Sequence, residues 1–398
     1  MNNTPVFRFS GFKGDWEPYT LGELAEIVRG ASPRPIQDPI WFDEGSDVGW
    51  LRISDVTEQG GRICHLEQKI SKVGQAKTRV LTTPHLLLSI AATVGKPVIN
   101  YVKIGVHDGF LIFLNPQFDQ EFMFQWLENF RTNWQQYGQP GSQVNLNSDL
   151  VKMQEIKLPS NKEQAAIGNF FYTFDKNIIL NKCKLNGLKQ LKEGYLQQML
   201  PHEGKSMPRV RLAGFTGPWK LRKLGDIAIV EMCRRVFKEQ TSSVGDVPFY
   251  KIGTFGGNPD AFISRDLYEE YKEKYPYPEI GDILISASGS IGRVVEYGGQ
   301  DEYFQDSNIV WLKHMGRLNN GFLKQFYSVV KWKGLEGTTI KRLYNKNILD
   351  TEIRVPCLDE QAAIGIFFRN IDNQITAQQA KLDGLKQLKS AYLQKMLV

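Results

Sequence analysis

Two stretches of the chain carry the same long pattern of apolar and polar positions. Residues 159–200 align with residues 356–397 without a gap, and 24 of the 42 aligned positions are identical. In both stretches apolar residues recur at steps of three and four and are flanked by Lys, Gln and Asn, which is typical of an amphipathic helix with one apolar face. A repeat of this length indicates an internal duplication, so both helices have the same surface to bury.

The shared apolar face predicts that the two helices pack on each other. The positions expected in this helix pair are Ile167, Phe171, Ile178, Leu185, Leu188 and Leu191 in the first helix and Ile364, Phe368, Ile375, Leu382, Leu385 and Leu388 in the second. Asn181 and Gln378 interrupt the two faces at the same place, and a polar residue there fixes the register at a cost in stability. The alternative is two unrelated surface helices that each cover their own domain, which leaves the shared pattern unexplained.

The duplication includes a short motif in front of each domain. Its residues are Pro5, Arg8, Gly11, Phe12, Gly14, Trp16, Leu21 and Gly22 in the first copy and Pro208, Arg211, Gly214, Phe215, Gly217, Trp219, Leu224 and Gly225 in the second. The repeating unit is therefore a globular domain followed by a long helix. The predicted order is a first domain at 1–158, a first helix at 159–200, a linker at 201–207, a second domain at 208–355 and a second helix at 356–398.

The linker limits how the two helices can pair. Residues 201–207 reach about 24 Å when fully extended, whereas each helix would be about 60 Å long, or about 45 Å if Gly168 breaks its first turns. The second domain must then begin near the far end of the first helix. We therefore predict an antiparallel pair with a domain at each end, related by a pseudo-two-fold axis.

Each domain has the pattern of a mixed α/β fold. Short apolar runs predict strands at 49–53, 86–94 and 110–114, with counterparts at 248–252, 283–291 and 308–312, and helices are predicted at 122–134 and 322–332. The fold class is α+β, with two mixed α/β domains joined by an antiparallel coiled-coil pair of helices. The predicted strands agree between the copies while the loops differ, which favours one task performed on two different targets.

Composition narrows the class of protein. The net charge of +6 favours an anionic partner, although so mild a surplus is common in proteins that bind no nucleic acid. No apolar run is long enough to span a bilayer, and the first residues lack a secretory pattern, so a cytoplasmic location is expected. Cys64, Cys183, Cys233 and Cys357 stand singly, without the spacing of metal ligands or of a disulfide framework.

Catalytic chemistry is not indicated by the sequence. Residues 286–292 lack the spaced glycines and the terminal Gly-Lys-Ser/Thr of a phosphate-binding loop. The histidines do not recur at equivalent positions, and no nucleophile lies in a pattern with a base. Asp108 and Asp306 are equivalent between the copies, but each is interpreted as a turn cap at a strand start. The chain is therefore expected to bind a partner, with no metal and no cofactor of its own.

The duplicated motifs resemble a known family. Arg-x-x-Gly-Phe-x-Gly-x-Trp, a variable domain, Pro-x-x-x-Glu-Gln-x-x-Ile and a Leu-Lys-x-Leu-Lys helix follow one another twice between Pro5 and Leu397. This order resembles the specificity subunit of Type I restriction-modification enzymes. The resemblance implies two target-recognition domains that each read half of an asymmetric bipartite DNA site, and a helix pair that sets their spacing. It also implies a non-catalytic chain whose partners are two methyltransferase (modification) subunits, which bind S-adenosylmethionine, and motor-nuclease (restriction) subunits.

Polar and basic side chains in the domain loops are the candidates for contact with double-stranded DNA. They are Arg29, Ser32, Arg34, Ser89, Thr93, Lys96, Gln143 and Asn145 in the first domain, and Arg234, Arg235, Lys238, Ser288, Ser290, Arg293, Thr338, Lys341 and Arg342 in the second. Docking of the methyltransferase subunits is expected on exposed positions of the repeat helices and on the front motifs, including Trp16 and Trp219. For these two tryptophans a place in the domain cores is an equally good interpretation.

Two other functions stay open at this point. A scaffold whose paired helices bridge two ligand-binding domains would bind nucleic acid, if at all, without the salt dependence that phosphate contacts impose. A self-contained methyltransferase or nuclease would bind its cofactor as an isolated chain, and the sequence shows none of the motifs for that.

Overall fold

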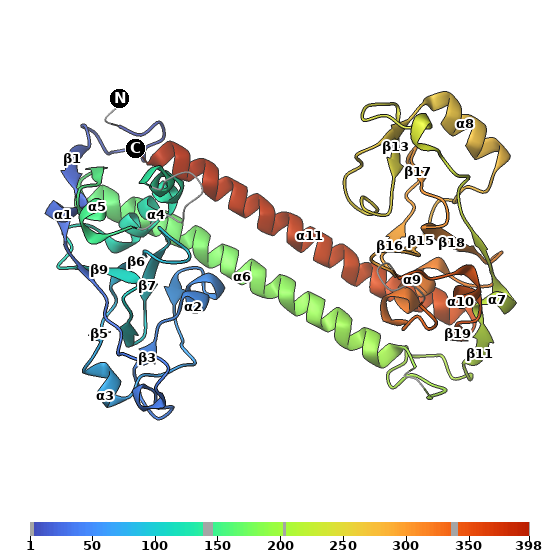
Figure 1. The fold of residues 1–398 in the computed structure, drawn as a ribbon, viewed down its shortest axis with the longest axis horizontal. Coiled ribbons are helices and arrows are strands. Elements are labelled where there is room, and N and C mark those ends of the chain that lie inside the picture. The colour runs from blue at the N-terminus through green and yellow to red at the C-terminus, as the bar shows by residue number, and fades with distance from the viewer. Residues whose placement is uncertain (1–3, 138–145, 202–203, 336–340, 398) are drawn as a thin grey trace. The chain divides into compact units, whose positions relative to one another are not determined.

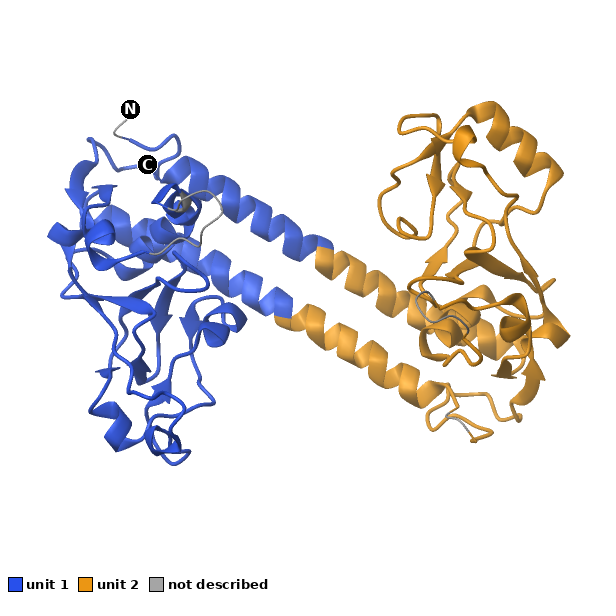
Figure 2. Cartoon of the chain, in the orientation of Figure 1, with its two compact units in different colours: residues 1–182, 380–398 blue, residues 183–379 orange. Residues whose placement is uncertain are grey.

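Two helices of 39 residues, α6 (Asn161–Met199) and α11 (Leu358–Met396), run through a fold that otherwise consists of short strands and helices (Figure 1). The computed structural model describes residues 4–137, 146–201, 204–335 and 341–397. The chain divides into unit 1, residues 1–182 and 380–398, and unit 2, residues 183–379 (Figure 2). Both long helices therefore contribute one part to each unit.

Unit 1 contains a five-stranded sheet in the order β2-β9-β6-β7-β4, a three-stranded sheet β3-β8-β5 and the pair β1-β10. Its strands are β1 (Glu17–Thr20), β2 (Glu26–Arg29), β3 (Gly49–Trp50), β4 (Arg62–Ile63), β5 (Arg79–Leu81), β6 (Leu86–Ser89), β7 (Pro97–Asn100), β8 (Ile104–Val106), β9 (Phe110–Leu114) and β10 (Glu155–Leu158). Its short helices are α1 (Leu21–Leu24), α2 (Ile53–Glu58), α3 (Lys72–Gln75), α4 (Gln120–Phe130) and α5 (Ser148–Lys152).

Unit 2 contains a four-stranded sheet in the order β12-β18-β15-β16, a three-stranded sheet β14-β13-β17 and the pair β11-β19. Its strands are β11 (Lys220–Lys223), β12 (Ile229–Glu231), β13 (Val247–Tyr250), β14 (Phe262–Ile263), β15 (Ile283–Ser286), β16 (Val294–Glu296), β17 (Tyr303–Phe304), β18 (Ile309–Lys313) and β19 (Glu352–Val355). Its short helices are α7 (Leu224–Ile227), α8 (Arg265–Lys274), α9 (Asn320–Val329) and α10 (Asn345–Leu349).

The predicted strands are mostly present, and the exceptions have local causes. The strand predicted at 110–114 is β9, with its counterpart at β18. The strand predicted at 49–53 stops at Trp50 because Asp55 accepts a hydrogen bond from the backbone N–H of Arg52 at 2.8 Å, which begins α2. The apolar run from Leu86 ends as a strand at Ser89, and the residues after it form a turn.

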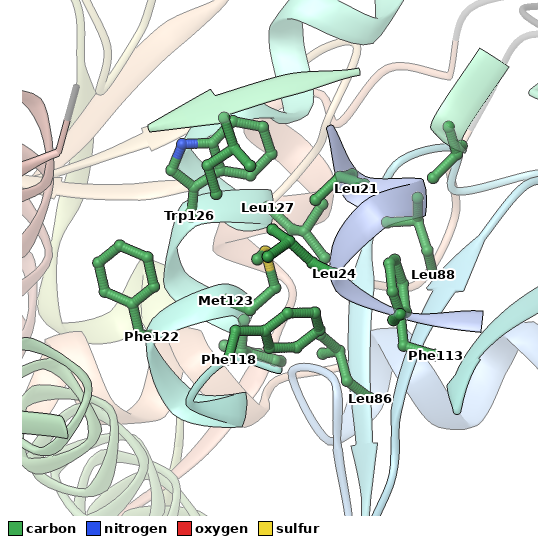
Figure 3. Close-up of a cluster of buried hydrophobic side chains, with 14 of the residues drawn as sticks. Leu21, Leu24, Leu86, Leu88, Phe113, Phe118, Phe122, Met123, Trp126 and Leu127 are labelled. Carbon is green, nitrogen blue, oxygen red and sulfur yellow. The ribbon is translucent and has the colours of Figure 1, made fainter. Parts of the chain in front are cut away.

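Packing of α1 and α4 against the five-stranded sheet makes one hydrophobic core of unit 1 (Figure 3). Trp16 of the front motif is 1% exposed and meets Phe122 edge to face at 5.9 Å. Trp219 is 3% exposed and meets Phe322 in the same way at 5.8 Å. These tryptophans are core anchors, so the prediction that they dock a partner is wrong for both.

The Glu-Gln pair near the start of each long helix attaches that helix to its domain. Glu163 accepts hydrogen bonds from Arg8 at 2.7 Å on both carboxylate oxygens. The side chain of Gln164 accepts from the backbone N–H of Asp119, the N-cap residue of α4, at 2.9 Å. Arg211 repeats the first contact on Glu360. The side chain of Gln361 accepts from the backbone N–H of Asn319 at 2.9 Å, which repeats the contact of Gln164 in the second copy.

Gly168 does not break α6. A Cβ atom at this position would lie 2.8 Å from the backbone nitrogen of Phe122 and 2.7 Å from a carboxylate oxygen of Asp119. Its equivalent in the second copy, Gly365, lies similarly close to Asn319. Each glycine is thus needed for the close approach of the short helix α4 or α9 to the long one.

The two long helices pack antiparallel within each unit, as predicted. In unit 1 the first half of α6 lies beside the end of α11, where Phe170 and Tyr392 meet at 5.4 Å and Lys389 binds Asp175 at 2.5 Å. The same pattern occurs in unit 2 between the end of α6 and the start of α11. There the rings of Tyr195 and Phe367 lie 4.9 Å apart, and Lys192 binds Asp372 at 2.7 Å.

Burial along this helix pair corrects the predicted seam at one position in each helix. Leu185 and Leu382 are buried at 4% and 3%, but Leu191 and Leu388 are exposed at 48% and 46%. A position six residues beyond Leu185 is rotated by about 120° around the helix, whereas one seven residues beyond returns to nearly the same face. The seam therefore continues through the lysines that bind Asp372 and Asp175, and the prediction is wrong for the two leucines.

The other predicted seam positions are buried to different degrees. The fully buried ones are Ile167, Phe171, Ile364 and Phe368, and the half-buried ones are Ile178, Leu188, Ile375 and Leu385. Asn181 and Gln378, the polar interruptions of the two stripes, are each 7% exposed. The duplicated stripe is therefore covered along most of its length.

Candidate nucleic-acid interface

The loop after β2 gathers three predicted DNA-facing residues around one carboxylate in unit 1. Because β2 pairs antiparallel with β9, its end lies beside the turn that precedes β9. Asp108 in this turn accepts hydrogen bonds from Ser32 Oγ at 2.8 Å and from the Arg34 guanidinium at 2.6 Å. The Nε of Arg29 donates to the backbone oxygen of Asp108 at 2.6 Å. Asp108 is thus the centre of a cluster, and its interpretation as an isolated turn cap is wrong.

Electrostatics keep the Asp108 carboxylate charged. Burial alone would raise its pKa, but the hydrogen bond from Ser32 and the positive charge of Arg34 outweigh burial, so the pKa lies below its ordinary value. The Arg34 side chain is 71% exposed and the carboxylate 37% exposed. The pair presents donors suited to a guanine edge or a phosphate, and an acceptor suited to a cytosine amino group.

A recess of about 240 Å³ opens beside this pair. Its lining residues are Ser32, Arg34, Ile36, Trp50, Arg52, Ile53, His107 and Asp108. The rings of Trp50 and His107 lie 5.9 Å apart, and burial lowers the pKa of His107. The recess therefore combines an apolar, aromatic wall with two arginines. A second recess of the same volume is lined by Arg29, Ile90, Ala91, Leu146 and Asn147.

The corresponding loop of unit 2, after β12, presents arginines on aromatic rings. Arg234 lies over the ring of Tyr275 at 5.1 Å, and Arg235 lies over the ring of Phe237 at 5.6 Å. Tyr275 and Phe237 are 37% and 53% exposed. Stacking limits the freedom of a guanidinium while leaving its donors at the edge of the plane free. Lys238, also exposed, adds a further cation.

Two of the predicted serines are too deeply buried to remain candidates for contact with DNA. Ser89 is fully buried, and its hydroxyl donates to the backbone oxygen of Ala91 at 2.9 Å. Ser288 is 5% exposed and donates to the side-chain oxygen of Asn308 at 2.6 Å. Both hydroxyls hold turns between strands, which is why small polar residues occur there.

Three further candidates have polar atoms that are bonded or buried within their own unit. The Lys96 ammonium binds Glu128 at 2.8 Å with 17% of its side chain exposed. The Thr93 hydroxyl is buried without a hydrogen-bond partner among the described residues. Arg293 keeps an exposed side chain but donates to the backbone oxygen of Phe255 at 2.7 Å. Lys96 and Thr93 therefore also leave the set, and Arg293 stays in it.

The other predicted residues are exposed or lie outside the described residues. The exposed ones are Ser290, Lys341 and Arg342. The predictions for Gln143, Asn145 and Thr338 fall on residues outside the described part of the chain. Arg342 forms an isolated antiparallel bridge with Ser288, so Arg342 lies beside the turn after β15.

Several members of the two clusters were missed from the sequence. The sequence predicts only an ordinary strand at Trp50 and Arg52, and no motif singles out Tyr275 or Phe237. Asp108 had one usable signal, since an aspartate stands at the equivalent place in both copies. No group of three or more His, Cys, Asp or Glu side chains suited to a metal ion occurs among the described residues. In the same part of the chain, no helix is long and apolar enough to cross a membrane.

A family model and curated relatives match this chain. The model, described as the Type I restriction modification DNA specificity domain, matches residues 13–190 and again residues 217–387. A type I restriction enzyme specificity subunit of Haemophilus influenzae is 53% identical over 161 residues, which are 39% of this chain and 42% of the relative. The MjaVIII specificity subunit of Methanocaldococcus jannaschii is 20% identical over 96% of this chain and 92% of its own length.

Solved structures share the fold. The S subunit of a Type I restriction-modification system from M. genitalium superposes with a TM-score of 0.64 over 99% of both chains, at 15% identity. A chain from a structure of the assembly and conformational transition of a type I R-M system gives 0.53 over 96% of this chain and 97% of its own, at 18% identity. Both chains therefore share the fold of this chain over nearly their whole length.

Proposed function

Since the chain belongs to the family of Type I restriction-modification DNA specificity subunits, which are not themselves catalytic, we propose that it reads an asymmetric bipartite DNA site. The recognition domains would be residues 1–158 and 208–355, joined by the linker 201–207. Residues 159–200 and 356–398 would form the helix pair that sets the distance between the half-sites.

One observation carries this proposal: the frame of each domain is repeated, while the exposed clusters on the two frames differ. Arg8–Glu163 and Arg211–Glu360 are the same contact made twice. The loop after β2, however, forms a cluster around Asp108, whereas the loop after β12 stacks arginines on rings. Equal frames with unequal surfaces are what two readers of different half-sites require.

The DNA-facing residues follow from exposure and charge. In the first domain we assign Arg29, Ser32 and Arg34 to the interface, with Asp108 as the residue that positions them. In the second domain we assign Arg234, Arg235, Lys238, Ser290, Arg293, Lys341 and Arg342. The recess beside Arg34 suits a protruding base edge, since aromatic and arginine side chains both line it.

The partners follow from the family. Two modification subunits would bind S-adenosylmethionine and methylate adenine at the site that this chain selects, and restriction subunits would complete the complex. The helix pair would dock the modification subunits. A cytoplasmic location is part of the same proposal, since the DNA substrate is there.

The test is to express the chain with a cognate modification subunit and to map adenine methylation across the host genome. A two-part motif that appears only when this chain is present is the expected result. Arg34→Ala and Arg235→Ala should each weaken DNA binding in a gel shift at moderate salt while leaving modification-subunit binding intact. Methylation without a chain-dependent motif would contradict the proposal.

A further inference from the structure

Arg52 is the N-cap residue of α2, and its side chain lines the recess of about 240 Å³ beside Arg34. This side chain is 40% exposed, whereas that of its partner Asp55 is 5% exposed. Asp55 accepts hydrogen bonds from Nε of Arg52 at 3.2 Å and from Nη2 at 2.9 Å. It also accepts from the backbone N–H of Arg52 at 2.8 Å. One edge of the guanidinium is therefore held by a buried carboxylate.

The contact with Asp55 leaves the other edge of the guanidinium unused. A guanidinium has five N–H donors in a fixed plane, and a carboxylate bound to Nε and Nη2 takes two of them. Among the described residues, Nη1 of Arg52 has no hydrogen-bond partner. Both N–H groups of Nη1 and the second N–H of Nη2 remain. One from each nitrogen forms the pair that binds O6 and N7 of a guanine.

Two carboxylates beside Arg52 make a phosphate a poor partner for it. Besides Asp55, Glu67 places a carboxylate oxygen 3.9 Å from Nη2, with 84% of its side chain exposed. One cation and two anions this close together carry a net negative charge, which repels the DNA backbone. The edge of a base is uncharged and needs only the free donors of Arg52.

The neighbouring Arg34 has the opposite charge balance. Among the described residues it donates only from Nη2, to the carboxylate of Asp108, and Arg29 contacts the backbone oxygen of the same aspartate. Two cations beside one carboxylate leave a positive charge, which attracts a phosphate. The Arg34 side chain is also 71% exposed, so it is less fixed than an arginine held at two nitrogens. The two arginines of the recess therefore suit different parts of DNA.

The second domain carries a cation at the place of Arg52. Lys251 is its equivalent in the alignment of residues 49–53 with residues 248–252. The backbone N–H of Lys251 donates to the hydroxyl of Thr254 at 3.2 Å, as that of Arg52 donates to Asp55. The Lys251 ammonium binds Asp260 at 2.8 Å, and its side chain is 42% exposed. The position is therefore repeated while its side chain and its partner differ, as the reading of two different bases requires.

We propose that Arg52 reads a guanine in the half-site of the first domain and that Asp55 is its positioning residue. This inference rests on the proposed function and adds a specificity-determining residue to it. The free edge of the guanidinium donates two hydrogen bonds, to O6 and N7 of the guanine in the major groove, while Asp55 fixes its plane. Trp50 and Ile53 line the same recess and shield these hydrogen bonds from water.

The first test compares the methylation motifs of the wild-type chain, Arg52→Ala and Arg34→Ala, each expressed with a cognate modification subunit. The half of the motif that stays unchanged when residues 208–355 are exchanged belongs to the first domain. We expect this half to contain a guanine, and Arg52→Ala should accept any base at that one position. Arg34→Ala should lower the methylation of all sites alike and keep the motif.

Two further variants separate base reading from general effects. Lys103→Ala is the matched control, because Lys103 is a 49% exposed cation of the same unit that binds Asp47 and is not among the residues lining the recess. It should keep the wild-type motif. Asp55→Asn should relax the same single position as Arg52→Ala, since it loses the charge that holds the guanidinium. Added to Arg52→Ala it should not change the motif further, which a merely structural role of Asp55 does not predict.

A change in the DNA tests the contact without a change in the protein. Replacing the guanine by 7-deazaguanine removes the N7 acceptor. The complex of the wild-type chain with its modification subunit should lose affinity for this DNA by about tenfold in a competition assay at fixed salt. The Arg52→Ala complex should bind both DNAs equally. Unchanged affinity of the wild-type complex would overturn the inference, even if the variant chain did not fold.

Three results of the motif comparison would also overturn it: a first half-site without guanine, an unchanged motif in Arg52→Ala, or a relaxed position in the other half. Equal weakening of all sites by Arg52→Ala, with a smaller salt dependence, would assign Arg52 to a phosphate and overturn the inference too. If the wild-type chain gave no two-part motif of its own, the proposed function itself would fail.

Discussion

Glu163 and Glu360 are carboxylates almost wholly removed from water, and each is held by one arginine of the front motif. Both side chains are 1% exposed, while their partners Arg8 and Arg211 are 17% and 16% exposed. A carboxylate this deep is tolerated only when it is paired and hydrogen-bonded. Trp219 also donates to Glu360 at 3.4 Å. The arginine–glutamate pair is thus the same in both copies, whereas the indole N–H of Trp16 has no hydrogen-bond partner among the described residues.

Removing one arginine should therefore cost more than its own contact. We expect Arg8→Ala to lower the free energy of unfolding of unit 1 by about 3 kcal/mol, because Glu163 is left buried and unpaired. Arg34→Ala, which breaks an exposed pair with Asp108, should cost less than about 1 kcal/mol. Urea unfolding followed by tryptophan fluorescence measures both.

A double variant checks the cause. Adding Glu163→Gln to Arg8→Ala should restore part of the loss, since the amide needs no counter-charge. Equal losses for Arg8→Ala and Arg34→Ala, or no recovery in the double variant, would show that the buried charge is not what makes this contact strong.

At the scale of elements, the helix pair is held by leucines and by two lysine–aspartate pairs that the duplication placed symmetrically. Lys389–Asp175 and Lys192–Asp372 join α11 to α6 in unit 1 and in unit 2. In unit 1 the same aspartate also accepts from Arg62 at 2.9 Å. The pair is thus part of the attachment of the first domain to its helix.

Mutations of a buried and of an exposed leucine of α6 should have clearly different effects on the free energy of unfolding. Leu185→Ala removes a buried side chain and should lower the free energy of unfolding by about 2–5 kcal/mol. Leu191→Ala removes an exposed one and should change it by less than about 0.5 kcal/mol. Thermal unfolding of the full chain measures the difference. A larger loss of stability for Leu191→Ala than for Leu185→Ala would show that Leu191 belongs to the seam, as the sequence predicted.

Acid should weaken unit 1 through Asp175. Burial alone would raise its pKa, but Lys389 and then Arg62 outweigh burial and lower it below the ordinary value. The carboxylate therefore stabilises the fold above its unfolded pKa of about 4, and this stability is lost as the pH falls through the lower folded value. Asp175→Asn should be less stable than the wild type at pH 7, and the difference should shrink below about pH 4.

The pH series is measured by thermal unfolding, with Asp149→Asn as the control. The Asp149 side chain is 82% exposed beside Lys152, so its replacement should change the midpoint little at any pH in the series. A gap between Asp175→Asn and the wild type that stays constant down to the lowest pH would contradict the assignment.

The helices and strands that form the frame can be predicted from the sequence, whereas the polar clusters on them cannot. The long helices, their antiparallel pairing and strands such as β9 follow from periodicity, which is a property of neighbouring residues. The prediction is wrong for Leu191 because steps of three and steps of four both keep apolar residues near one helix face, and the seam passes through Lys192 instead. The partners of Asp108 and Glu163 lie 74 to 155 residues away, and a single sequence holds no signal for such pairings.

At the scale of the whole molecule, the duplication separates what each half shares from what it does alone. Arg211 and Asn319 attach the second domain to Glu360 and Gln361, as Arg8 and Asp119 attach the first. Among the described residues, no hydrogen bond or ion pair joins the clusters around Arg34 and Arg235 to these frame contacts. Under the proposed function, a domain could therefore change its DNA-facing surface without changing its attachment.

Exchange of residues 208–355 for the matching domain of another family member tests this separation. The donor domain must carry an arginine equivalent to Arg211 and a polar N-cap equivalent to Asn319, so that Glu360 and Gln361 keep their partners. Methylation mapping should then show a new sequence in one half of the motif and an unchanged sequence in the other, with the gap between them preserved. A change in both halves would mean that the two domains do not read independently. A changed gap would mean that the attachment at Glu360, rather than the helix pair alone, sets the distance between the half-sites.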